Sequence, residues 1–176
     1  MDKVILVNKN NRKIGEMEKL EAHQKGLLHR AFSIFVFNKD NELLLQQRNP
    51  KKYHSGGLWT NTVCSHPAPG ETYNVAVHRR LKEEMGFDCT LVKLGCFIYR
   101  AAFPNGLIEN EYDCIFAGKY DGVIEPNSEE ISDHCWLNLE EISENIQDNP
   151  EKYTFWFKKI LSDKETLHLL QNYLRN

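Results

Sequence analysis

Hydrophobic residues in the first half of the chain occur in short runs that are separated by polar, turn-forming residues. Residues 4–8 and 13–17 are two such runs on either side of an Asn-rich turn, a pattern that predicts a β-hairpin. Residues 31–37 and 42–47 flank a second polar turn and predict another pair of strands. Residues 57–64 combine β-branched and aromatic side chains and predict one further short strand.

The second half of the chain predicts one long hairpin and one short strand. Residues 91–103 and 107–118 are joined by Pro104-Asn105-Gly106, a tripeptide that favours a turn. Residues 132–137 predict the last strand, and they are followed directly by helical patterning.

Three segments predict helices. Residues 71–85 carry an apolar stripe that recurs every four residues, and Gly86 follows as a typical C-terminal stop. Residues 139–147 and 150–174 are also predicted to be helical, with a break in the latter near residues 162–163. The stripe of the first helix consists of Tyr73, Val77, Leu81 and Met85. Paired strands with interspersed and late helices predict an α+β fold, in which a mixed β-sheet packs between helices.

Length, charge and hydropathy restrict the class of protein. The 176 residues suit one domain over 1–176, with an N-terminal hairpin at about 1–20 and a C-terminal helical extension at about 150–176. The net charge is -3 and basic residues are scattered, which argues against a nucleic-acid partner. We expect no signal peptide, because no basic segment followed by an apolar stretch stands at Met1. We expect no membrane segment, because no apolar run approaches the roughly 20 residues of a membrane span.

The five cysteines are an odd number and lack CxxC spacing. We therefore expect a reducing, cytoplasmic location, because a disulfide framework normally uses an even set of spaced cysteines.

Polar side chains collect on one face of the long predicted hairpin. Glu109 and Glu111 are two apart on a strand, so their side chains share a face. If the turn centres on Asn105, Tyr99 lies directly opposite Glu111, with Cβ atoms roughly 5 Å apart. The alternative is a solvated sheet face, which is the commoner fate of Glu on an antiparallel strand.

His23, His29 and His66 are candidate metal ligands only as a set. Each histidine alone is more often a surface or hydrogen-bonded residue. Together with Glu109 and Glu111 they would form three nitrogen and two oxygen ligands, which suit Zn²⁺, Mn²⁺ or Fe²⁺. The spacing matches no zinc-finger or HExxH pattern, so it is a weak signal by itself.

The predicted helix at 71–85 carries two i,i+4 ion pairs, Arg79 with Glu83 and Arg80 with Glu84. They are either ordinary surface pairs or part of a phosphate site. In the second case Glu84 would hold Mg²⁺ and Arg80 would face a phosphate. The further basic residues that could join such a site are Lys19, Arg48 and Lys52.

Residues 65–87 resemble a Nudix box. The matching positions are Glu71, Arg79, Leu81, Glu83, Glu84 and Gly86. Ser65 replaces the first Gly of that pattern, and Arg80 replaces a Glu that Nudix hydrolases normally use among their metal-binding carboxylates. A cation at that position favours holding a diphosphate over hydrolysing one.

Further motifs resemble the signatures of type I isopentenyl-diphosphate delta-isomerase, a Nudix-fold enzyme family. They are residues 20–23 (LEAH), 28–32 (LHRAF), 59–67 (WTNTVCSHP) and 109–112 (ENEY). The resemblance runs from near the N-terminus to about residue 157, and it leaves the final helix after about residue 161 unplaced. It implies that isopentenyl diphosphate is converted to dimethylallyl diphosphate by a 1,3-proton transfer in isoprenoid biosynthesis.

The resemblance also implies roles for the polar residues. Cys64 would transfer a proton at one face of the substrate and Glu111 at the other, with Tyr99 assisting protonation. A tightly bound Mn²⁺ or Zn²⁺ would make the proton of Glu111 more acidic. Its ligands would be His23, His29, His66, Glu109 and Glu111.

For the diphosphate, the resemblance implies a Mg²⁺ ion held by Glu84 and by the backbone carbonyl of Cys64. Trp156 would cover the isoprenyl tail, and Lys51 could substitute for Lys52. The cations that would face the diphosphate are Lys19, Arg48, Lys52 and Arg80. We expect a small-molecule substrate and a monomer or weak homodimer.

Two rival interpretations stay open at this point. A Nudix hydrolase of a nucleoside diphosphate derivative would need Glu83 and Glu84 but not Cys64. A non-catalytic Nudix-fold module would bind a diphosphate without turnover.

Overall fold

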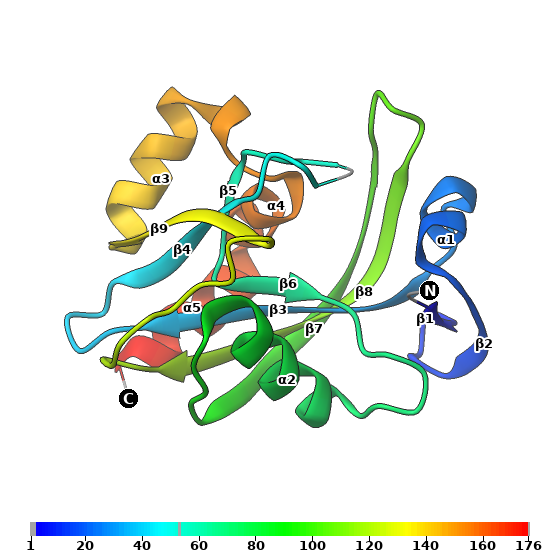
Figure 1. Ribbon diagram of the computed structural model, residues 1–176, viewed down its shortest axis with the longest axis horizontal. Helices are drawn as coiled ribbons and strands as arrows, with labels where there is room; N and C mark the ends of the chain where they lie inside the picture. Colours follow the sequence, from blue (N-terminus) through cyan, green and yellow to red (C-terminus); the bar gives the residue numbers. More distant parts are fainter. Residues whose placement is uncertain (1–2, 53, 176) are drawn as a thin grey trace.

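The structure is a computed structural model that describes residues 3–52 and 54–175. Within these residues nine strands form one mixed β-sheet with helices on both faces (Figure 1). The strands are β1 (Lys3–Val7), β2 (Lys13–Glu18), β3 (His29–Phe37), β4 (Leu43–Arg48), β5 (Trp59–Thr60), β6 (Val63–Ser65), β7 (Leu91–Ala102), β8 (Ile108–Lys119) and β9 (Ile131–Leu137). The helices are α1 (Lys19–Lys25), α2 (Tyr73–Met85), α3 (Leu139–Asp148), α4 (Phe155–Ser162) and α5 (Lys164–Arg175), with a 3₁₀ turn at Pro150–Lys152.

β3 is the central strand of the sheet. It pairs in parallel with β8 along its whole length and antiparallel with β6. Its apolar residues alternate between two buried faces, with Phe32 and Ile34 facing the α2 side and Phe35 and Phe37 facing the side of the C-terminal helices. Burial on both faces explains why this segment reads as a nearly continuous hydrophobic run.

The pairing expected between residues 31–37 and 42–47 is confined to one residue pair, Phe37 with Leu43. The two strands diverge because Thr62 inserts between them. Its hydroxyl accepts a hydrogen bond from the backbone N–H of Val36 at 2.9 Å and donates to the carbonyl of Leu44 at 2.8 Å. The single strand expected at 57–64 is therefore two short strands, β5 and β6, on either side of this insertion.

α2 confirms the predicted helix, with small differences at its start. The Thr72 side chain caps it by accepting a hydrogen bond from the N–H of Val75, and Gly86 ends it in a left-handed conformation at φ 77°. Val77, Leu81 and Met85 are fully buried against the sheet, and each contributes on the order of 2 kcal/mol of hydrophobic stabilisation.

Two features of the fold differ from expectation. α1 was not predicted, because seven residues without strong periodicity give too little signal. The cysteines were expected to suit a reducing compartment, yet Cys96 and Cys114 form a disulfide, because the register of β7 and β8 places these two residues directly opposite each other.

The break expected near residues 162–163 is confirmed, since Asp163 separates α4 from α5. Among the described residues no helix is both long and apolar enough to cross a membrane.

Candidate active site

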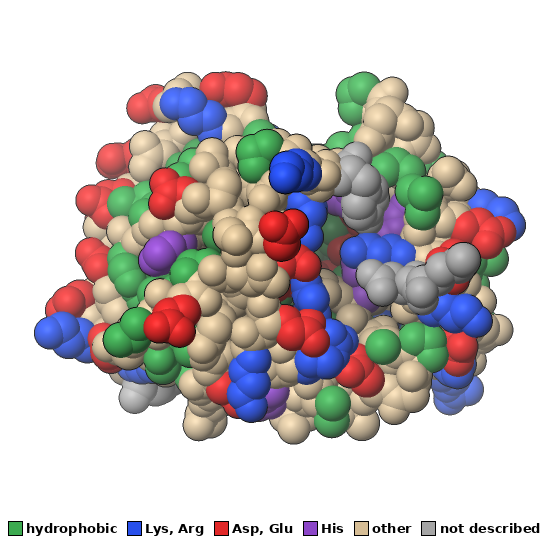
Figure 2. Space-filling model, viewed as in Figure 1, with side chains coloured by type: hydrophobic (Ala, Val, Ile, Leu, Met, Phe, Trp, Pro, Cys, Tyr) green, Lys and Arg blue, Asp and Glu red, His purple; other side chains and the backbone are tan. Residues whose placement is uncertain are grey.

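Two adjoining cavities open on one face of the molecule, and both are lined by Lys19, Ser65 and His66. The inner cavity is also lined by aromatic and catalytically useful side chains, among them Cys64, Tyr99, Glu109, Glu111 and Trp156. The outer cavity is lined mainly by charged side chains, among them Lys52, Arg79, Arg80 and Glu130. Figure 2 shows this face, on which Lys, Arg, Asp and Glu side chains surround a hollow that exposes histidines.

The predicted hairpin register is confirmed. β7 and β8 place Tyr99 directly opposite Glu111, and the Tyr99 hydroxyl donates a hydrogen bond to Glu111 Oε2 at 2.6 Å. Glu109 and Glu111 are 3% and 7% exposed, so the alternative of a solvated sheet face is wrong for these residues. Buried carboxylates require partners, and the histidines provide them.

α1 and the start of β3 bring His23 and His29 to these carboxylates. Gly26 ends α1 in a left-handed conformation at φ 61°, which turns the chain back into β3. The Nδ1 atoms of the two histidines lie 2.6 Å from the carbonyl of Lys19 and 2.8 Å from that of Leu27. Because Nδ1–H donates to a carbonyl, Nε2 is the ring nitrogen that each histidine directs toward the carboxylates.

Three imidazole Nε2 atoms converge on the two carboxylates. His23 Nε2 lies 3.1 Å from Glu109 Oε2, while His66 Nε2 and His29 Nε2 lie 2.8 and 3.6 Å from Glu111 Oε1. Burial lowers the pKa of His66 to about 3, which keeps its ring in the neutral form that binds metal ions.

These residues fit a divalent cation. His29 Nε2 is buried and has no hydrogen-bond partner within the described part of the chain. One ligand atom from each of His23, His29, His66 and Glu111 lies within 4.8 Å of the others. Nitrogen and oxygen donors in this arrangement suit a first-row transition metal such as Mn²⁺ or Zn²⁺.

His54 also lies at this site, although sequence reasoning did not identify it. It lies in the loop between β4 and β5, its side chain is 7% exposed, and its Nε2 lies 3.2 Å from Glu109 Oε1. A single histidine in a loop has no spacing that marks it as a ligand, so only its position in space shows its relation to Glu109.

Cys64 lies on β6 and pairs with Ser33 of β3. Its thiol donates to Asn61 Oδ1 at 2.9 Å. The amide nitrogen of Asn61 donates to the carbonyls of Ile34 and Val63, both at 3.0 Å, so the amide oxygen must face the sulfur. Burial raises the pKa of Cys64 to about 12, and the thiol is therefore neutral in this structure.

Trp156 is connected to the same thiol by hydrogen bonds. Its indole N–H donates to the Thr60 hydroxyl at 2.9 Å, and that hydroxyl donates to Asn61 Oδ1 at 3.1 Å. Trp156 lies in the first turn of α4, is 4% exposed and lines the inner cavity. The aromatic ring that covers the cavity and the thiol in its wall are thus held by one buried network.

Asn61→Ala is expected to destabilise the fold by about 2–3 kcal/mol, because it removes the buried amide that donates to the carbonyls of Ile34 and Val63 and accepts from Cys64 and Thr60. The free energy of unfolding, measured by urea denaturation, tests this. Asn10→Ala is the matched control, since Asn10 is exposed in a surface turn. An unchanged stability of Asn61→Ala would contradict the network.

The predicted basic residues are divided between the two cavities. Arg48 lines the inner cavity, with its guanidinium 5.1 Å from the centre of the Trp156 ring. Lys52 lines the outer cavity and pairs with Glu130, whereas Lys51 is exposed. Arg80 also lies in the outer cavity. Sequence reasoning missed Glu130, which lies 78 positions along the chain from Lys52.

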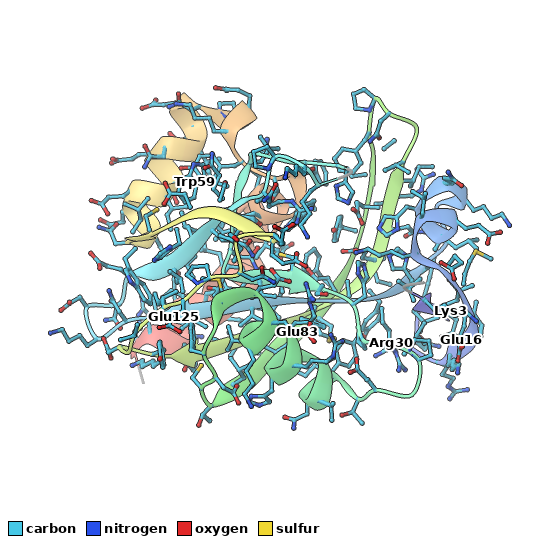
Figure 3. The ribbon with its side chains drawn as sticks, viewed as in Figure 1. Lys3, Glu16, Arg30, Trp59, Glu83 and Glu125 are labelled. Carbon is cyan, nitrogen blue, oxygen red and sulfur yellow. A yellow bond between two sulfur atoms is a disulfide. The ribbon has the colours of Figure 1, made fainter. Side chains whose placement is uncertain are left out.

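Glu84 is buried beneath Arg80 and lies outside the residues that line the two cavities. Its Oε1 accepts a hydrogen bond from Arg80 at 2.5 Å and its Oε2 accepts one from Gln46 at 3.0 Å. Glu83, labelled on α2 in Figure 3, lines the outer cavity and pairs with Arg79 and Arg80. A cation at Glu84 would therefore have to displace Arg80 or share its carboxylate.

Comparison with known proteins shows the family and the fold of this chain. The family model of the NUDIX domain matches residues 27–157. Isopentenyl-diphosphate Delta-isomerase 2 of Photorhabdus laumondii is 53% identical over 92% of this chain and 92% of its own length. The enzyme named Isopentenyl-diphosphate Delta-isomerase from Burkholderia multivorans is 49% identical, with 89% of each chain covered.

Solved structures show the same fold at low sequence identity. A protein from Deinococcus radiodurans superposes with a TM-score of 0.70 at 21% identity, covering 84% of this chain and 90% of its own. The MutT protein from Methanosarcina mazei gives a TM-score of 0.63 at 17% identity, covering 84% and 94%.

Proposed function

The chain belongs to the isopentenyl-diphosphate Delta-isomerase family and contains a NUDIX domain, and we propose that it converts isopentenyl diphosphate to dimethylallyl diphosphate. One observation carries the proposal. The inner cavity is lined both by Cys64 and by Glu111, whose carboxylate accepts a hydrogen bond from the Tyr99 phenol. A double-bond shift requires proton transfers at two separate carbons, so two proton-transferring groups in one cavity suit it.

The two cavities divide the substrate between them in this proposal. Lys52 and Arg80 would bind the diphosphate in the outer cavity, and Lys19 and Arg48 would bind it nearer the inner one. Binding the charged head positions the featureless tail against the reacting groups. The family box position that carries Glu in hydrolases is Arg80 here, which favours holding the diphosphate.

The reaction adds one proton to the terminal alkene carbon and removes one from carbon 2, so atoms and charge balance. In this proposal Glu111 transfers a proton on one side of the substrate, with Tyr99 assisting protonation. Cys64 transfers a proton on the other side. The tertiary carbocation between the two steps would lie beneath Trp156. The face of this ring could stabilise it by about 2 kcal/mol when water is excluded.

We propose that His23, His29, His66, Glu109 and Glu111 hold one Mn²⁺ or Zn²⁺. Bound there, the ion supplies positive charge that favours the carboxylate form of Glu111 and makes its proton more acidic. We also propose that Glu84 and the Cys64 backbone carbonyl hold Mg²⁺ together with the diphosphate.

Removing metal ions with a chelator is expected to abolish isomerisation. Mg²⁺ alone should restore less activity than Mg²⁺ with Mn²⁺ or Zn²⁺, because the His/Glu ligand set and the diphosphate site prefer different ions. Initial rates after each addition check this, with metal content measured in parallel. Full recovery with Mg²⁺ alone would contradict the two-metal proposal.

Proton NMR of isopentenyl diphosphate with the protein in D₂O tests the function directly. Dimethylallyl diphosphate that carries solvent deuterium supports the isomerase. Release of phosphate or nucleotide from a nucleoside diphosphate derivative would favour the hydrolase instead. Tight diphosphate binding without any turnover would favour a binding module.

We propose a cytoplasmic setting, because Cys64 must stay reduced to transfer a proton. In that setting the Cys96–Cys114 pair would be open, with the two thiols facing each other across β7 and β8. We also propose a monomer or weak homodimer. Residues 1–176 would form one domain, since β1 pairs with β3 and α4 packs into the core.

A further inference from the structure

Two groups of side chains that could hold a metal ion share His23, and both include residues that line the inner cavity. The first is His23, His29, His66 and Glu111, and the second is His23, His54 and Glu109. In each group one ligand atom per residue lies within 4.8 Å of the others. The family resemblance accounts for every one of these residues except His54.

His23 belongs to both groups and can bind only one ion. Its Nδ1 lies 2.6 Å from the Lys19 carbonyl, which accepts the Nδ1 proton. Only Nε2 remains as a ligand atom, and a single lone pair cannot serve two cations. The two groups therefore cannot both hold an ion, and a single ion here would take its ligands from one group or draw the two groups together.

We propose that His54 is a sixth ligand of the metal ion held by His23, His29, His66, Glu109 and Glu111. The proposal rests on the metal site of the proposed function and extends it. His54 Nε2 lies 3.2 Å from Glu109 Oε1, and His23 Nε2 lies 3.1 Å from Glu109 Oε2. Neighbouring ligands of one octahedral ion with bonds of about 2.1 Å lie about 3 Å apart, so each histidine lies at that distance from the Glu109 oxygen that it faces. The two groups are not within 4.8 Å of one another as a single set, so binding one ion requires them to draw together.

Neighbouring side chains and backbone contacts hold the His54 ring in place beside Glu109. The ring lies edge-on to Trp156, with centroids 5.8 Å apart, and 5.8 Å from the ring of Phe103. The Arg48 guanidinium donates to the carbonyls of His54 and Ser55, both at 3.2 Å. Binding of His54 to the ion would thus order the β4–β5 loop together with Arg48 and Trp156.

Six protein ligands would leave no open coordination position for the substrate. This suits an isoprenyl tail, which carries no atom that competes with imidazole or carboxylate for a cation. The ion would then act through Glu111 and through the order of the loop, and not by contact with the reacting carbons.

Nitrogen-15 NMR of the histidine side chains with bound Zn²⁺ tests the inference in the full chain. The sequence contains seven histidines, so we expect four metal-bound Nε2 resonances and three unbound rings. His54→Gln should remove one of the four. His168→Ala, in an exposed position on α5, should leave all four. Three bound rings in the wild-type protein would overturn the proposal without use of any variant.

Zn²⁺ affinity gives a second readout, measured by competition with a chromogenic chelator. His54→Gln is expected to weaken binding at least about tenfold, and His168→Ala should not change it. Wild-type affinity in folded His54→Gln would contradict the proposal. The isomerase assay separates the two hypotheses, because an active wild-type enzyme with three bound rings refutes only the role of His54. A wild-type protein with four bound rings but no isomerase activity refutes only the proposed function.

Discussion

Glu111→Gln is expected to lower kcat for isomerisation by about a thousandfold or more, within the range typical of losing a general acid or base. An amide of the same shape cannot exchange a proton with the substrate. It would also give up the carboxylate that accepts the Tyr99 hydroxyl at 2.6 Å and that faces His66 Nε2 at 2.8 Å. The NMR assay of dimethylallyl diphosphate formation measures the loss, and metal content is measured on the same sample.

Glu129→Gln is the matched control, because Glu129 is exposed and lines neither cavity. It should keep the wild-type rate. Wild-type turnover in folded Glu111→Gln would remove Glu111 from the proton-transfer role.

The second large effect is expected for Cys64→Ala, which should reduce kcat by about a hundredfold to ten-thousandfold. The substitution removes the only proton-transferring atom of that side chain. The fold should remain, because Thr60 still donates to Asn61 Oδ1 at 3.1 Å after the thiol is gone. The same NMR assay measures turnover, and circular dichroism confirms that the variant is folded.

Cys135→Ala is the control for Cys64→Ala, since Cys135 is a half-buried thiol on β9. It should leave turnover unchanged. If Cys64→Ala turned over like the wild type, the thiol would have no role in the reaction.

Metal content distinguishes the two variants. Glu111→Gln should bind Mn²⁺ or Zn²⁺ more weakly, because it changes a proposed ligand. Cys64→Ala should bind the tight ion like the wild type, because the thiol is not among the proposed ligands. Equal loss of metal in both variants would mean that Cys64 acts through the metal centre.

Local features of the fold could be predicted because they depend on neighbouring residues. The stripe of Val77, Leu81 and Met85 repeats at the helical period, and Gly86 supplies the left-handed stop. The pairing of Tyr99 with Glu111 follows from a turn centred on Asn105 and a strand period of two. In each case the interactions that favour the structure lie within one helix or one hairpin.

The choice of strand partners was beyond such reasoning. β3 was expected to pair with β4 but lies parallel to β8, which places His29 opposite Glu111. Nothing local distinguishes these pairings, because both strands would bury similar apolar side chains. The whole sheet decides between them, with Thr62 occupying the space between β3 and β4.

The sequence by itself determined the helix of α2, the hairpin face of Tyr99 and Glu111 and, through its motifs, candidate polar residues for the site, although not His54 or Glu130. Only the tertiary structure decided which of them meet. It buried Glu84 beneath Arg80, placed Glu130 beside Lys52 and brought His54 to Glu109. Such contacts join residues that are far apart along the chain. They form only when the sheet has assembled and its strands and loops lie next to each other.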